Sequence, residues 1–186
     1  MVRTAGIKGS DWAVSIGGFR DASIGDIDGF LERMGEAVAP ALFQVFDADR
    51  VAGWEHLFFA AVNAVKAHEA GAAISRSLAI EVLLYVSCQD QISRALDLMG
   101  VTPSTERVAL LVLADGEEAA EKAFGRASVA LGREDDSVLG LDAEKCVRIK
   151  ETFGVSDSEL EAVGGSELDA LLWLLVERGA LLPLRR

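Results

Sequence analysis

Four residues that could hold a divalent metal ion lie close together in the first third of the sequence. Asp47, Asp49, Glu55 and His56 fall within ten residues of one another, and carboxylate oxygens and imidazole nitrogens are common ligands of such ions. A small metal-dependent hydrolase is therefore one hypothesis. The alternative is a solvated turn followed by the start of a helix, where the helix dipole favours acidic side chains. We favour the turn, and we expect no metal and no cofactor.

Other catalytic patterns are missing from the sequence. It contains no GxxxxGK[ST] phosphate loop, no GxSxG nucleophile elbow and no HExxH zinc motif. The two histidines, His56 and His68, leave little scope for acid–base chemistry. Cys88 and Cys146 lie in apolar helical contexts, which favours buried reduced thiols. We expect no catalytic residue.

Glu81 is an acidic residue within the apolar stretch LAIEVLLYV. An ionised carboxylate in such a helix is costly unless it is paired or hydrogen-bonded. A catalytic acid is one explanation, and a structural buried acid is the one that we favour. Arg76 is one candidate partner, although a spacing of five residues does not place two side chains on one helix face.

The overall charge is acidic, with 18 Lys and Arg against 30 Asp and Glu and a net charge of −12. This excludes a generically basic nucleic-acid binder, because such binding comes mainly from neutralised phosphates. Lys66, Arg76 and Arg94 stand out against this background. They are either solubility residues or a small anion-binding patch at helix ends.

The order of the predicted elements favours an α+β domain, a small and mostly antiparallel sheet covered by many helices. Strands are predicted over 12–19, 41–46 and 107–113, the last of these being the most convincing buried strand. Asp26, Ser75, Ser156 and Ser166 are predicted to begin helices, and Ser156 and Glu159 have the spacing of a capping box. The segment 128–136 is expected to be a loop. Long helices are predicted over 53–70, 75–87 and 167–178.

The apolar runs are far shorter than the roughly 20 residues of a membrane span. The first residues, MVRTAGIKGSD, show no signal peptide. We expect a soluble cytoplasmic protein that folds as a single domain over 1–186.

The middle of the chain resembles the Cgi-type kinase-binding subunit of the KEOPS complex, also known as the PRPK-binding protein family. The resemblance rests on the order and spacing of Phe43 to Asp47, His56-Leu57, Gly71, Ser75-Arg76, Leu78, Glu81, Leu83 to Tyr85, Gln91 to Ser93 and Gly100-Val101. The segment LLWLLVERGALL near the end is similar to that family's C-terminal helix. The resemblance covers about residues 12–182 and is weakest over 125–145.

The resemblance implies a non-catalytic subunit. It would bind and stimulate the small atypical kinase of KEOPS, an ATPase, and capture the 3′ CCA end of tRNA during threonylcarbamoyladenosine modification. Single-stranded RNA ends are held by base stacking and a few cations. The residues expected at the RNA site are Asn63, Lys66, Ile74, Ser75, Arg76 and Arg94.

The last helix is the expected kinase site. Its run of six consecutive apolar residues cannot all face the core of a helix that lies on the surface, and the excess should form an exposed patch. The residues expected there are Leu171, Trp173, Leu174, Val176 and Arg178, with Leu174 among the exposed ones. A homo-oligomeric scaffold that uses this helix for self-association, without an RNA role, is the remaining alternative.

Overall fold

The apolar run that begins at Val108 forms the central strand of an antiparallel sheet. In the computed structural model, which describes residues 3–185, β4 pairs with β2 on one side and β3 on the other. The other edge of β2 is shared by β1 and β5, which pair with different parts of it. The strands are β1 (Arg3–Gly6), β2 (Trp12–Arg20), β3 (Leu42–Asp47), β4 (Val108–Asp115) and β5 (Arg133–Glu134).

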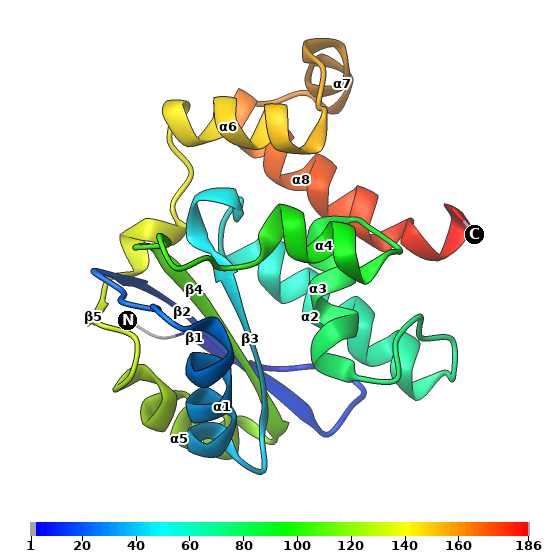
Figure 1. Ribbon diagram of the computed structural model, residues 1–186. Coiled ribbons are helices and arrows are strands. Elements are labelled where there is room, and N and C mark those ends of the chain that lie inside the picture. The colour runs from blue at the N-terminus through cyan, green and yellow to red at the C-terminus, as the bar shows by residue number, and fades with distance from the viewer. Residues whose placement is uncertain (1–2, 186) are drawn as a thin grey trace.

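Helices cover both faces of this sheet, as Figure 1 shows. They are α1 (Ile27–Val38), α2 (Trp54–Glu69), α3 (Leu78–Ser87), α4 (Ile92–Met99), α5 (Glu117–Ser128), α6 (Ala143–Phe153), α7 (Asp157–Val163) and α8 (Glu167–Ala180). The described residues also form short 3₁₀ helices, η1 (Ala48–Arg50) between β3 and α2, η2 (Asp136–Leu139) between β5 and α6, and η3 (Leu182–Arg185) after α8. The α+β prediction is confirmed. None of the helices in the described part of the chain is long and apolar enough to cross a membrane.

Alternation along β4 divides the core into two layers, because successive side chains of a strand point to opposite faces. Val108, Leu110 and Val112 pack with α1 and α5. Leu111 and Leu113 pack with the layer that contains α2 and α3. Residues 108–114 of this strand are buried on both faces, which explains why this part of its sequence is apolar rather than alternating.

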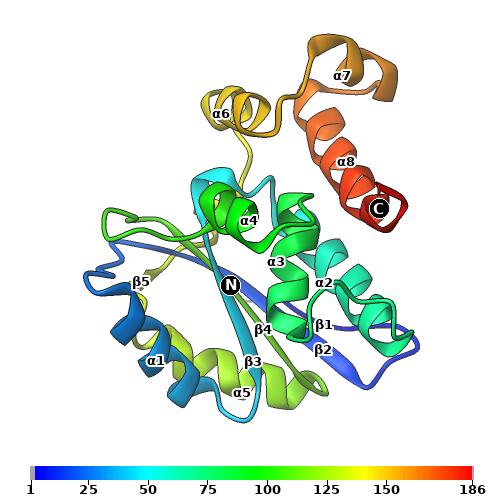
Figure 2. The same cartoon turned by 45° about the vertical axis from the view of Figure 1, so that its right-hand side comes forward.

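The C-terminal helices form a group on the α2–α3 side of the sheet, away from α1 and α5 (Figure 2). Their own apolar cluster joins α6 and α7 to the inner side of α8. α8 also packs against α2 and α3. Gly179 allows the close approach to α3, since a Cβ there would lie 2.9 Å from the carbonyl oxygen of Tyr85.

Two local predictions were wrong. Residues 128–136 are not only loop, because Arg133 and Glu134 form β5 against Arg20 and Phe19 of β2. The first strand, β1, was missed altogether, since its short sequence RTAG carries no apolar alternation. The caps at Asp26 and Ser166 and the capping box at Ser156 are confirmed.

Candidate interaction surfaces

The two aspartates of the hypothetical metal site, Asp47 and Asp49, form ion pairs with arginines at η1. Asp47 Oδ1 accepts from the backbone N–H of Asp49 at 3.0 Å, and its other oxygen lies 3.5 Å from Arg50 Nε. Asp49 Oδ2 accepts from Arg107 Nη2 at 2.7 Å. Burial raises the pKa of Asp47 above its usual value. Both carboxylates therefore stabilise the conformation of η1 through these contacts.

His56 points into the core, away from these carboxylates. Its Nδ1 accepts from the backbone N–H of Ala52 at 3.2 Å, and its Nε2 lies 3.0 Å from the carbonyl oxygen of Val86. No three His, Cys, Asp or Glu side chains within residues 3–185 are placed to share a metal ion. The hypothesis of a metal site on Asp47, Asp49, Glu55 and His56 is therefore wrong, because these side chains do not converge and both ring nitrogens of His56 are hydrogen-bonded to backbone groups.

Glu81 is fully buried and acts as a structural acid. Its Oε1 accepts from the backbone N–H of Ile74 at 3.0 Å, and its Oε2 accepts from that of Ser75 at 2.7 Å. The carboxylate therefore holds the α2–α3 loop, and it forms no ion pair with Arg76. This also corrects the predicted cap: the N-cap of α3 is Ser77 rather than Ser75, since the amide of Ser75 is turned towards Glu81.

The α2–α3 loop folds back on the last turn of α2. The backbone N–H of Ala72 donates to Ala67 O at 2.9 Å, and the Nε2 of His68 donates to the carbonyl oxygen of Arg76 at 3.2 Å. Arg76 is exposed, and its guanidinium makes no ion pair with any described side chain. Lys66 is exposed on the same turn of α2.

The other expected RNA-site residues divide into two groups. Ile74 and Ser75 lie in the loop itself, and Asn63 lies one turn before Lys66 on the same side of α2. Arg94 is exposed on α4, the helix that follows α3. The fold thus places three of the six residues in the α2–α3 loop, two on the second half of α2 and one on α4.

The expected kinase residues on α8 are partly misplaced. Leu171 and Leu174 are buried, with exposed fractions of 0% and 8%, because they belong to the apolar cluster that α8 shares with α6 and α7. Trp173 is 46% exposed and Val176 is half-buried. Leu174 was expected to be exposed, and that expectation was wrong.

Arg178 is engaged within the chain. Its guanidinium donates to the Phe153 carbonyl oxygen at 2.8 Å and to Glu159 Oε1 at 2.6 Å. Hydrogen bonds from the Ser156 backbone and from Arg178 lower the pKa of Glu159 to about 2. Arg178 therefore ties α8 to α7, and its charge is already compensated.

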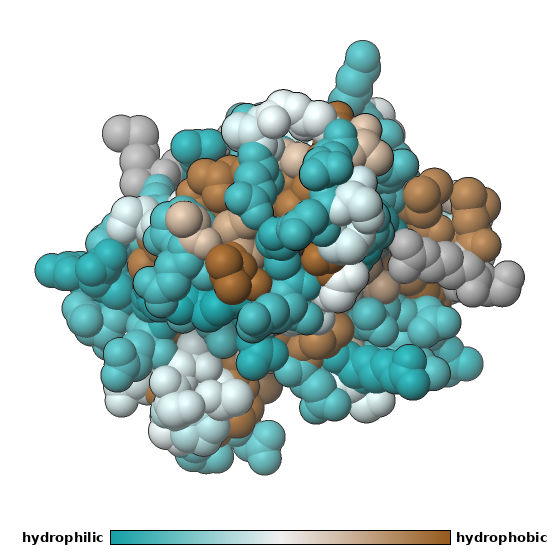
Figure 3. Space-filling view, turned by 90° about the horizontal axis from the view of Figure 1, so that it is seen from above, coloured by the Kyte–Doolittle hydropathy of each residue, from teal (hydrophilic) through white to brown (hydrophobic). Residues whose placement is uncertain are grey.

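The exposed face of α8 is a row of apolar side chains, which we name the α8 stripe. It comprises Trp173, Val176 and Ala180, spaced by three or four residues on α8, together with Leu184 of η3. The exposed Glu177 lies beside them. Leu184 is 79% exposed, and Leu181 beside it is 40% exposed. Seen from above in Figure 3, apolar surface is gathered near the C-terminal end of the described chain, amid largely hydrophilic neighbours. Ala180 and Leu184 were missed by the sequence analysis, although their spacing from Trp173 could have indicated them.

An aromatic row connects Trp173 to the start of α2. The ring of Trp173 lies 5.8 Å from that of Phe59, which is 5.4 Å from Phe58, and Phe58 stacks on Trp54 at 4.6 Å. The contact between Phe59 and Trp173 joins this row on α2 to α8.

Comparison with known proteins identifies the family of the chain. No curated protein matches it. The family model described as "Kinase binding protein CGI-121" matches residues 30–169, about three quarters of the chain. The matched region runs from α1 into the first turn of α8, so it contains the whole α2–α3 loop and the sheet from β3 onward. The chain belongs to the CGI-121 family of kinase-binding proteins.

Proposed function

We propose that the chain is a non-catalytic regulatory subunit of the KEOPS tRNA modification complex, which docks onto the kinase of that complex through the α8 stripe. The proposal depends on the exposure of the apolar side chains of the α8 stripe. A contiguous apolar row on the surface is typical of a protein interface, and an exposed tryptophan is the residue type most often found to dominate binding energy there. The family's kinase-binding description supports the same partner.

Docking would bury the part of α8 that the fold itself leaves uncovered. The inner side of the helix is used by Leu171, Leu174 and Leu175, so only the outer row remains for a partner. In this proposal the bound subunit stimulates the ATPase activity of the kinase and has no catalytic role of its own.

The kinase proposal is tested by titrating the purified KEOPS kinase of the same organism into Trp173→Ala. Because a central tryptophan contributes about 2 kcal/mol or more, the Kd should rise by roughly 30-fold or more. Val129→Ala is the matched control, since Val129 is 87% exposed after α5 on the other side of the molecule. An unchanged Kd for a folded Trp173→Ala would remove the α8 stripe from the interface.

The second part of the proposal is that the α2–α3 loop captures the 3′ CCA end of tRNA. Arg76 and Lys66 supply cations, Ile74 supplies an apolar platform, and the first amides of α3 offer donors to a phosphate. Glu81 holds the loop that presents these groups. The local arrangement allows a net acidic protein to bind RNA through a small, focused site.

Arg76→Glu tests the RNA site, because it replaces an exposed cation without removing a described hydrogen bond of its side chain. Affinity for intact tRNA should fall at least tenfold, while kinase binding stays at the wild-type level. Arg33→Glu, an exposed charge reversal on α1, is the control. A mutant that still distinguishes intact tRNA from tRNA with a trimmed CCA end would place the RNA site elsewhere.

A further inference from the structure

The two edges of the sheet differ in how they are protected. β3 is the last strand on one side, and none of the described residues adds a strand beyond it. The opposite edge is divided between the short strands β1 and β5, which carry Arg3, Arg133 and Glu134. Short strands and charged side chains are common ways to keep a sheet edge from pairing with another chain. β3, with the sequence LFQVFD, has no proline and no charge before its last residue.

The register with β4 determines which backbone groups of β3 point outwards. The backbone N–H of Ala48 donates to the carbonyl oxygen of Arg107 at 3.0 Å, and this pair continues the register of the two strands. Hydrogen-bonded and non-hydrogen-bonded pairs alternate along an antiparallel ladder. The even-numbered residues of β3 therefore bond to β4. The N–H and C=O groups of Phe43, Val45 and Asp47 point to the outer edge.

These outward groups form an open row. Within residues 3–185, no hydrogen bond engages the backbone N–H groups of Phe43, Val45 and Asp47. Figure 2 shows β3 at the near edge of the sheet, with α1 on one side of it and α3 on the other. Donors and acceptors that alternate along a free strand are the groups to which an added strand binds.

The side chains of β3 are arranged symmetrically about Gln44, because two apolar residues precede it and two follow it. In an antiparallel pair of β3 strands with the two Gln44 residues opposite each other, Leu42 faces Phe46 of the second copy. Phe43 faces Val45 of the second copy on the other side of the sheet. Apolar cross-strand pairs of this kind stabilise antiparallel strands. The same register joins the outward backbone groups of Phe43 to those of Val45.

We propose that β3 is a dimerisation edge, at which two copies of the chain join their sheets through antiparallel β3 strands related by a two-fold axis. A two-fold interface requires a surface that is complementary to itself, and the pattern around Gln44 meets this requirement. α1 extends the apolar surface beside the strand. A Cβ at Gly35 would lie 3.8 Å from the Phe43 ring, and Leu31, one turn earlier on the same side of α1, is 37% exposed.

Pairing through β3 leaves the α8 stripe free. α3 contacts both β3 and α8, and Figure 2 shows it between them. Dimerisation therefore does not depend on kinase binding, and the chain alone is enough to test it. Two copies that each carry a net charge of −12 repel each other. Association should therefore strengthen when salt screens this charge.

Sedimentation equilibrium of the full chain over a series of concentrations, at low and high salt, measures the association. The wild type should approach twice the monomer mass at the highest concentrations. Gln44→Lys and Gln44→Glu each place like charges opposite each other at the centre of the pairing, so each should raise the dimer Kd by about tenfold. A general charge effect would have opposite signs in the two variants, because lysine reduces the net negative charge and glutamate increases it.

Gln91→Lys is the matched control, since Gln91 is exposed at the start of α4 and the substitution adds the same charge away from the edge. It should associate at least as tightly as the wild type. Gln44 is half-buried, and the urea midpoint of each variant shows whether it stays folded.

A cysteine at position 44 tests the register independently. Opposite residues of a non-hydrogen-bonded pair have Cα atoms about 4.5 Å apart, a separation that a disulfide can span. Gln44→Cys should form a covalent dimer when glutathione disulfide oxidises the two thiols and is itself reduced. Gln91→Cys should not, and the native Cys88 and Cys146 are buried.

Two results would overturn the proposal. One is a chain that stays monomeric at every concentration and salt, with no covalent dimer of Gln44→Cys. The other is a dimer that Trp173→Ala abolishes while both charged variants of Gln44 leave it intact, which would assign self-association to the α8 stripe. If a charged variant fails to fold, the covalent dimer of Gln44→Cys decides between β3 and another surface.

Discussion

Replacing His56 tests how the first turn of α2 is held in place. The backbone N–H of Ala52 can only donate, so Nδ1 of His56 must be unprotonated to accept it. The carbonyl oxygen of Val86 can only accept, so Nε2 must carry the proton. The geometry therefore requires the neutral imidazole, because a second proton would face the Ala52 amide.

The expected loss of stability on acidification follows from the shift in the pKa of His56. Burial lowers the pKa of His56 from 6.5 to about 4. Because each unit corresponds to about 1.4 kcal/mol, the neutral histidine should account for about 3 kcal/mol of pH-dependent stability. The unfolded chain binds more protons between pH 6.5 and 4, so the free energy of unfolding is highest above pH 6.5 and falls as the pH drops towards 4.

Urea unfolding at several pH values between 7.5 and 4 measures this loss directly. His56→Gln should be less stable than the wild type at pH 7 by about 2 kcal/mol, because glutamine cannot satisfy both backbone groups. Its stability should fall less steeply on acidification, so the two curves should meet near pH 5. Parallel curves for the two proteins would refute the neutral, doubly hydrogen-bonded His56, since carboxylates that titrate in both proteins cancel in the comparison.

Two further substitutions test the other buried polar groups. Glu81→Gln should lower the free energy of unfolding by about 2–3 kcal/mol, because a glutamine cannot accept from the amides of both Ile74 and Ser75. Hydrogen exchange at those two amides should become faster. An unchanged exchange rate would argue against Glu81 holding the α2–α3 loop. Lys145, whose pKa burial lowers to about 8, donates from Nζ to the carbonyl oxygens of 138, 139 and 140 at 2.8, 3.4 and 3.2 Å. Lys145→Met should cost about 1–3 kcal/mol in urea unfolding at pH 7 by leaving these acceptors without a donor, whereas wild-type stability would show that another donor replaces it.

Local signals in the sequence were sufficient for much of the fold. The continuous apolar run of β4 marks a strand buried on both faces, and the spacing of Ser156 and Glu159 marks a helix start. These signals depend on neighbours in the sequence, so they can be interpreted without knowing what packs against them. The structural role of Glu81 was also predictable, because its apolar context requires hydrogen-bond partners.

The side of α8 that would face a partner could not be derived in the same way. Residues 171–176 are all apolar, so the helical period provides no contrast between Trp173 and Leu174. Packing against α6 and α7 buries Leu174 and leaves Trp173 exposed, and this packing depends on tertiary structure. The first helical residue of α3 was missed for a similar reason, since the hydrogen bonds to Glu81 displaced its cap to Ser77.

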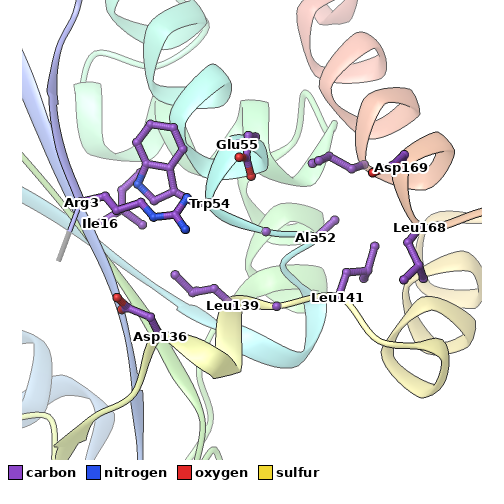
Figure 4. Close-up of a pocket in the computed structure, with 13 residues that line it drawn as sticks. Arg3, Ile16, Ala52, Trp54, Glu55, Asp136, Leu139, Leu141, Leu168 and Asp169 are labelled. Atoms are coloured by element: carbon purple, nitrogen blue, oxygen red, sulfur yellow. The ribbon is translucent and has the colours of Figure 1, made fainter. Parts of the chain in front are cut away.

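The surroundings of Glu55 likewise depend on tertiary structure. Glu55 was grouped with Asp47 and Asp49 because of their spacing in the sequence, whereas the fold places it in the lining of one pocket with Leu139 of η2 and Leu168 of α8 (Figure 4).

Hydrogen–deuterium exchange on the complex of the wild-type chain with the purified KEOPS kinase tests the central claim most directly. Binding of the kinase to the α8 stripe predicts slower exchange over 172–184 and over the first turn of α2, with α1 and α5 unchanged. The last turn of α8 should show the clearest effect, because Ala180 and Leu181 are exposed in the free chain. Protection confined to α1 and α5, with 172–184 exchanging as in the free protein, would contradict docking through α8.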